Sequence, residues 1–175
     1  MLKDFVPQYL GEKRFSRDQW LGQNTKMVKS LFDLTDDQFV IIADGTYCYC
    51  QKSSNNMVQR KLYSGHKKRP LVKPFVITAS NGKIIDVYGN YSAVENDASI
   101  MQKDLDLREL FKKGDILIFY RGFKDCISRL KSFYGLNCKI PTFLKDGQKQ
   151  MSSSETTPVR ISMRLHEKLL VTNIS

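Results

Sequence analysis

Between residues 39 and 50 the chain reads Phe39-Val40-Ile41-Ile42-Ala43-Asp44-Gly45-Thr46-Tyr47-Cys48-Tyr49-Cys50. Five consecutive apolar residues predict a buried strand, and the aromatic, β-prone residues after Gly45 predict a second strand. An Asp-Gly pair between two strands is typical of a hairpin turn. We therefore predict a strand, a turn and a strand, with Asp44 at the end of the first strand.

A second hairpin follows from the next apolar segments. Residues 72–78 and 83–88 have strand composition, and Asn81-Gly82 between them suits a turn that needs a positive φ angle. The polar residues 52–70 between the two hairpins predict a loop or a ragged strand edge. Upstream, residues 24–32 predict a short helix.

Helices and strands alternate in the second half of the chain. We predict a helix beginning near Asp97 and continuing to about residue 111, and a buried strand over 116–119. We then predict a second helix over 123–133, a short strand over 138–141, a polar loop over 146–158 and a last helix over 160–171. Antiparallel strands followed by alternating helices and strands predict an α/β fold, a ribonuclease H-like mixed sheet flanked by helices. We divide the chain into a lead-in segment, residues 1–35, and one domain, residues 36–175.

Charge and composition limit the functional class. The 175 residues carry 28 Lys and Arg against 18 Asp and Glu, a net charge of +10 with a pI near 9.5. Such a surface attracts polyanions, and DNA is the partner we expect. We expect no signal peptide and no membrane span. Four scattered cysteines do not suggest a disulfide scaffold, so we place the protein in the nucleus or cytoplasm and not among secreted proteins.

Two carboxylates in this fold have a possible chemical role. Asp44 lies at the end of the first strand and Asp97 at the start of the main helix, so both would hold one divalent cation, Mg²⁺ or Mn²⁺. Paired cations of this kind activate water against phosphodiester bonds. The alternative is that Asp44 is a turn residue and Asp97 a helix cap.

Several motifs together resemble one family. The residues that carry the resemblance are Asp44-Gly45-Thr46-Tyr47, the segment Gln59 to Lys67, Val72-Lys73-Pro74, Asn96-Asp97-Ala98-Ser99-Ile100, Gly114-Asp115-Ile116-Leu117, Arg121-Gly122-Phe123 and Pro141-Thr142-Phe143-Leu144-Lys145. In this order they are similar to the catalytic domain of DDE superfamily endonucleases, specifically the PIF/Harbinger transposases and their domesticated relatives. The resemblance implies a ribonuclease H-like fold and metal-dependent cleavage or strand transfer on DNA. It also assigns Asp44 and Asp97 to the first two acids.

The chain departs from this family at two expected acids. Tyr120 stands where the third acid precedes Arg-Gly-Phe, and a neutral phenol is a poor Mg²⁺ ligand. The last acid falls on Leu170, and Glu167 would replace it only if the last helix were shifted by about one turn. We therefore expect weak metal binding, impaired cleavage and a C-terminally truncated or divergent domain. Asp115 and Asp125 are not convincing replacements.

A basic stretch offers a second function. Phosphate contacts by Lys and Arg would give sequence-independent affinity for DNA. The alternative for this stretch is a solvated loop. The competing function is therefore a non-catalytic module derived from a transposase, which binds DNA or protein. Because no room remains before Asp44 for the family's helix-turn-helix region, a separate DNA-binding partner protein would supply specific recognition. The residues of the stretch are Arg60, Lys61, Lys67, Lys68, Arg69 and Lys73.

Overall fold

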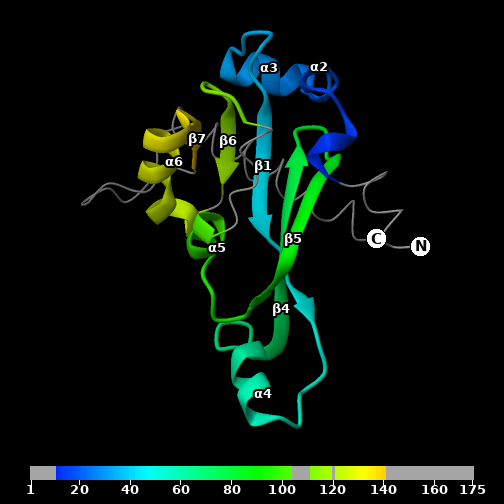
Figure 1. The fold of residues 1–175 in the computed structure, drawn as a ribbon, viewed down its shortest axis with the longest axis vertical. Helices are drawn as coiled ribbons and strands as arrows, with labels where there is room; N and C mark the ends of the chain where they lie inside the picture. The colour runs from blue at the N-terminus through cyan, green and yellow to red at the C-terminus, as the bar shows by residue number, and fades with distance from the viewer. Residues whose placement is uncertain (1–10, 104–110, 120, 141–175) are drawn as a thin grey trace, which may run out of the picture.

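The computed structural model of the chain describes residues 11–103, 111–119 and 121–140. Seven strands within these residues form a mixed sheet whose body has the order β5-β4-β1-β6-β7, and two short strands, β2 and β3, pair with one end of β4 (Figure 1). The strands are β1 (Val40–Gly45), β2 (Cys48–Tyr49), β3 (Tyr63–Ser64), β4 (Arg69–Ala79), β5 (Ile84–Ser92), β6 (Ile116–Phe119) and β7 (Asn137–Lys139).

The sheet is mixed, because it contains both antiparallel and parallel strand pairs. β4 is antiparallel to β1 and β5, whereas β6 is parallel to both β1 and β7. The parallel pair β6 and β7 is joined through helices, as parallel strands require. The predicted α/β fold, a ribonuclease H-like mixed sheet flanked by helices, is confirmed.

Short helices surround the sheet. Side-chain oxygens of Ser16, Thr25 and Asn55 cap α2, α3 and α4 by accepting backbone N–H groups of the first turn. Among the described residues no helix has the length and apolarity to cross a membrane. The helices are η1 (Glu12–Arg14), α2 (Arg17–Leu21), α3 (Lys26–Phe32), α4 (Asn56–Leu62), α5 (Asp97–Lys103), η3 (Arg121–Cys126) and α6 (Ile127–Tyr134).

Both faces of β1 and β6 are buried. Ile41 and Ala43 point into the larger core, which also contains buried residues of α5, η3 and α6, whereas Val40 and Ile42 point into a smaller core against Val28 of α3. A strand covered on both faces requires an uninterrupted apolar sequence, which explains the run over residues 39–43. The alternation also fixes which face each later residue of β1 presents.

Residues 11–35 are packed onto the end of the sheet where β1 begins. Trp20 is fully buried in the larger core against Phe15 and Phe39. Arg17 Nη1 and Nη2 donate to the two carboxylate oxygens of Asp115, at 2.7 and 2.5 Å. This N-terminal segment therefore shares the core and the ion pairs of the sheet.

The predicted Asp-Gly hairpin is wrong. β1 continues through Asp44 and Gly45, which pair with Val76 and Phe75 of β4. The chain then stays beside the same strand, because Thr46 N–H donates to the Pro74 carbonyl at 2.9 Å and β2 pairs with β4. β4 has eleven residues and accommodates β1 and β2 one after the other, so no reversal is needed.

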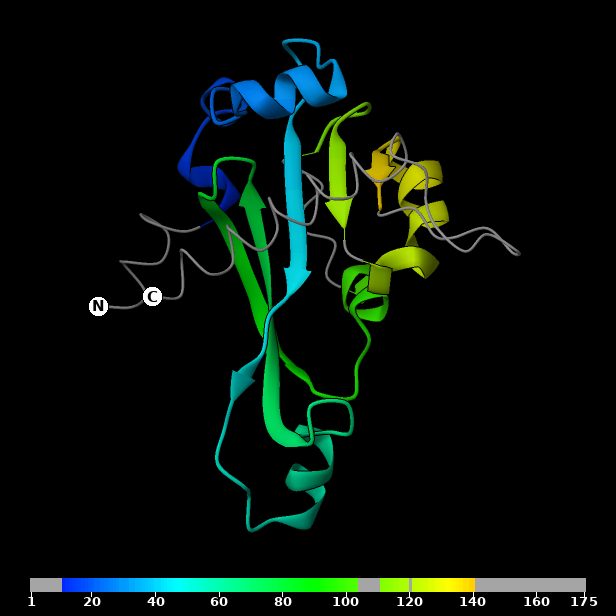
Figure 2. The ribbon, with the colours of Figure 1, turned by 180° about the vertical axis from the view of Figure 1, so that it is seen from behind.

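The prediction of a loop over residues 52–70 is also partly wrong, because α4 and β3 lie within this segment. Both views place β2 and α4 at the end of the molecule opposite α2 and α3 (Figures 1 and 2). We call residues 46–70 the basic arm. The short helix predicted over 24–32 is present as α3.

The later elements follow the sequence closely. The β4–β5 hairpin turns at Gly82 with φ 91°, α5 begins at Asp97, and β6 covers 116–119 as predicted. The second helix and the last short strand appear as η3 with α6, and as β7. Residues 104–110, the loop over 146–158 and the helix over 160–171 lie outside the described residues, as do Tyr120, Glu167 and Leu170.

Candidate active site

Asp97 is the first residue of α5, but it does not cap that helix. The side chain of Asn96 takes that role, because its Oδ1 accepts a hydrogen bond from Ser99 N–H at 2.6 Å. Ala98, Ile100 and Met101 are buried and fix α5 against the larger core. The Asp97 carboxylate is therefore held at a defined place by the helix while remaining available for other interactions.

Three separate segments meet around Asp97. A Cβ atom at Gly45, at the end of β1, would lie 2.7 Å from Asp97 Oδ1. A Cβ at Gly122, in η3, would lie 3.2 Å from Oδ2. Both glycines thus leave the space that the carboxylate fills, and their small size has a packing reason rather than a turn reason. The end of β1, the start of α5 and η3 converge here.

Asp44 leaves the opposite face of β1. Successive strand residues alternate, so Gly45 shares the face of Ile41 and Ala43, while Asp44 shares the face of Val40 and Ile42. Asp44 is half-buried and paired in the ladder with Val76. It is therefore a strand residue and not a turn residue, and its Cβ leaves β1 on the face opposite the one that Gly45 turns toward Asp97.

Lys73 contacts Asp97 directly. It lies on β4 on the same face as Leu71 and Phe75, and its side chain is 7% exposed. Its Nζ lies 2.7 Å from Asp97 Oδ1 and donates to the Glu95 carbonyl oxygen, also at 2.7 Å. Asp97 Oδ1 is buried and accepts no well-aligned hydrogen bond from the described residues, so the ion pair with Lys73 is the interaction that offsets its burial.

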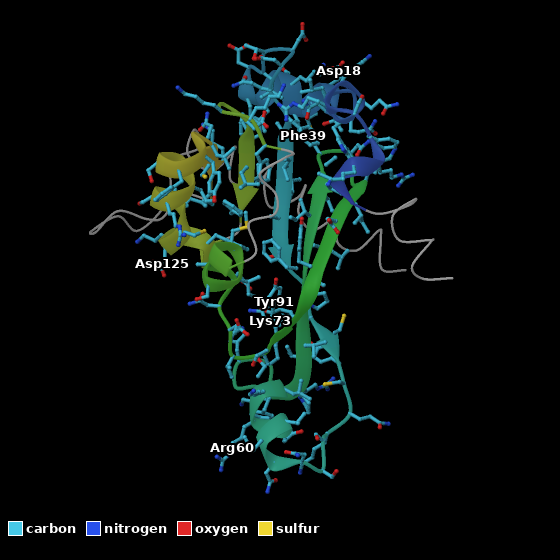
Figure 3. The ribbon with its side chains drawn as sticks, viewed as in Figure 1. Asp18, Phe39, Arg60, Lys73, Tyr91 and Asp125 are labelled. Carbon is cyan, nitrogen blue, oxygen red and sulfur yellow. The ribbon has the colours of Figure 1, made fainter. Side chains whose placement is uncertain are left out.

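Two tyrosines, Tyr91 and Tyr47, lie close to Lys73. Tyr91 of β5 is its cross-strand partner, and the two residues lie together at the centre of the molecule (Figure 3). The Lys73 ammonium lies 5.8 Å from the centroid of the Tyr47 ring. Burial raises the pKa of Tyr47, and the negative charges of Asp97 and Asp44 raise it further. Tyr47 therefore lies within the fields of both carboxylates.

Two further acids of the described residues, Asp115 and Asp125, form no metal-holding group with Asp97. Asp115 lies before β6, at the far end of that strand, where Arg17 and the N–H groups of Phe39 and Lys112 satisfy it. Asp125 is exposed on η3.

A divalent cation does not fit the side chains that the structure describes. DDE endonucleases usually use divalent metals, which prefer several oxygen ligands around one point. In the described part of the chain no three His, Cys, Asp or Glu side chains form such a group. Asp97 is paired with an ammonium, and the Cβ of Asp44 leaves the opposite face of β1.

The predicted DNA-contacting residues divide into two sets. Lys73 is buried in the site. The other five are exposed on the basic arm, and Arg60 of α4 lies at the end of the molecule opposite Asp18 (Figure 3). They are Arg60, Lys61, Lys67, Lys68 and Arg69.

Exposed tyrosines lie among these charges. Tyr47, Tyr49 and Tyr63 are 40%, 59% and 44% exposed. The Lys67 ammonium lies 5.0 Å from the centroid of the Tyr47 ring, and the Arg69 guanidinium 5.7 Å from that of Tyr49. The arm thus presents aromatic faces together with positive charge.

Comparisons with known proteins agree with the fold. No curated protein and no solved structure matches the chain. A family model described as DDE superfamily endonuclease matches residues 43–164, which is more than half of the chain and includes Asp44, Lys73, Asp97 and Tyr120. The chain therefore belongs to the DDE superfamily endonucleases.

Proposed function

We propose that this DDE endonuclease domain is derived from a transposase, binds DNA along its basic arm, and cleaves DNA only weakly. The observation that carries the proposal is the state of Asp97. Its carboxylate, which resembles an acid of the metal centre, is neutralised by Lys73 at 2.7 Å. Ancestral activity would be divalent-metal-dependent phosphodiester cleavage, a chemistry that needs several acids around the cations.

The sequence supports impaired cleavage independently. Tyr120 and Leu170 occupy the positions of two acids in the family pattern. A cluster that binds cations through its joint charge loses affinity with each acid removed. The order of motifs resembles the PIF/Harbinger transposases, and we propose that subfamily as the origin of the domain.

The basic arm supports DNA as the ligand. Five exposed positive charges lie along one projection, and they match the phosphate contacts that dominate affinity for DNA. Exposed tyrosines beside them would stack on bases where strands separate, or pack against the sugar backbone. The same surface favours the second candidate function, a non-catalytic DNA-binding or protein-interaction module.

Fluorescence anisotropy with a labelled DNA duplex tests this function. The variant Arg60→Gln/Lys61→Gln removes two charges from α4, and the matched control Lys26→Gln/Lys29→Gln removes two exposed charges from α3 at the opposite end. We expect the α4 variant to bind on the order of tenfold more weakly and its salt slope to fall by about two, with the control unchanged. Equal losses in both variants would reject the arm as the binding surface.

A further inference from the structure

Two oxygens beside the start of α5 hold the Lys73 ammonium. Its Nζ lies 2.7 Å from both Asp97 Oδ1 and the Glu95 carbonyl oxygen. A carboxylate and a carbonyl are the oxygen types that hard cations take as ligands. Lys73 is 5% exposed, and a buried ammonium is retained only where such partners replace water.

The surrounding residues fit the ammonium closely. A Cβ at Gly45 would lie 3.6 Å from Lys73 Cε as well as 2.7 Å from Asp97 Oδ1, so the backbone of β1 closes one side of the ion pair. Gly122 closes the Oδ2 side of the carboxylate. Tyr47 provides an aromatic ring to the ammonium, an arrangement that favours a cation.

From this arrangement we infer that Lys73 is the resident cation of the site and excludes a divalent metal ion from Asp97. The inference deepens the proposed function, on which it rests, because it gives a cause within the described residues for weak cleavage. It makes Lys73 a positioning residue that ties the segment before α5 to β4. No metal would then be needed to neutralise Asp97.

Mn²⁺ binding to the full chain tests the inference without DNA. The variant Lys73→Met keeps an unbranched side chain and removes the charge. The free Mn²⁺ signal in electron paramagnetic resonance gives the dissociation constant. We expect about 1 mM or weaker for the wild-type chain and at least tenfold tighter binding for Lys73→Met. The double variant Lys73→Met/Asp97→Asn should return to the wild-type level.

A matched control separates local exclusion from overall charge. Lys67→Met removes one charge from a lysine that also lies over Tyr47, at 5.0 Å. It should bind Mn²⁺ like the wild-type chain. Equal gains in Lys67→Met and Lys73→Met would overturn the inference, as would a wild-type chain that binds Mn²⁺ tightly through Asp97.

If Lys73→Met is unstable, the melting temperature with and without Mn²⁺ provides a second measurement. Mn²⁺ should raise the Tm of Lys73→Met, or of the polar variant Lys73→Gln, and should leave the wild-type Tm unchanged. If either folded variant shows neither tighter binding nor a Tm shift, Lys73 does not exclude the metal and the inference is rejected. A DNA-binding defect of the arm would change neither readout, so failure of the proposed function is distinguishable.

Discussion

Gly45 faces the Asp97 carboxylate so closely that a Cβ at residue 45 would lie 2.7 Å from Oδ1. The end of β1 and the start of α5 are thus fitted to each other at this one point. The same carboxylate holds Lys73 of β4, so three elements depend on one side chain.

Gly45→Ala should destabilise the fold. The new methyl group displaces Asp97 from Lys73, and overpacking of this kind costs about 1–3 kcal/mol. Urea unfolding measures the loss. Gly65→Ala is the control, because a Cβ there meets nothing within 4 Å, and it should change stability by less than about 0.5 kcal/mol. Equal effects would show that Gly45 does not make room for Asp97.

Arg17→Met should lower the free energy of unfolding more than Gly45→Ala does. Asp115 is 1% exposed, and removal of its guanidinium partner leaves a buried carboxylate with two backbone N–H donors and no countercharge, at a cost of about 3–5 kcal/mol. The control is Arg129→Met, which removes an exposed arginine from α6 and should be close to neutral. A neutral Arg17→Met would mean that the N-terminal segment is not anchored through this pair.

Tyr47 should titrate above its ordinary range. Its pKa is raised first by burial and then by Asp97 and Asp44, so the folded chain retains the phenol proton to higher pH than the unfolded chain. This contribution to stability is complete below the unfolded pKa near 10 and is lost as pH rises through the folded pKa.

The ultraviolet difference between the wild-type chain and Tyr47→Phe isolates this titration. In an Asp97→Asn background the pKa of Tyr47 should fall, although burial keeps it above normal. Asp18→Asn, on α2 at the other end of the molecule, should leave it unchanged. A titration unaffected by Asp97→Asn would place Tyr47 outside the field of the site.

Exposed and buried cysteines should differ in their rate of reaction with a thiol reagent. Cys48 is exposed, whereas Cys126 and Cys138 are buried and burial raises the pKa of each to about 11. With Ellman's reagent near pH 8, roughly one in a thousand of these two thiols is ionised, so they should react far more slowly than Cys48. Unfolding in urea should make all four react. Fast native reaction of the Cys48→Ser variant at Cys126 or Cys138 would contradict their burial.

Local patterns predicted the elements well. β6 coincides with the apolar run 116–119, and Asp97 begins α5, because strand composition and helix starts are set by neighbouring residues. The Asp44-Gly45 pair predicts a hairpin turn, and that prediction is wrong because Gly45 is needed for close packing against Asp97. The neighbouring residues do not distinguish a glycine that forms a turn from one that leaves space for a side chain.

Long-range pairs could not be predicted in the same way. Arg17 and Asp115 are 98 residues apart and no pattern connects them. The sequence groups Lys73 with the basic residues of the arm, because charge counts carry no information on burial. Its position in register with Leu71 and Phe75 of a strand is a signal that could have placed it inside.

Nicking of supercoiled plasmid DNA by the purified chain, with Mg²⁺ or Mn²⁺, is the most direct test of a DDE domain with weak cleavage. We expect a metal-dependent rate only slightly above that of Asp44→Asn/Asp97→Asn, which measures contaminating nuclease. Strong metal-dependent nicking by the wild-type chain, far above this background and lost in both Asp44→Asn and Asp97→Asn, would contradict weak cleavage.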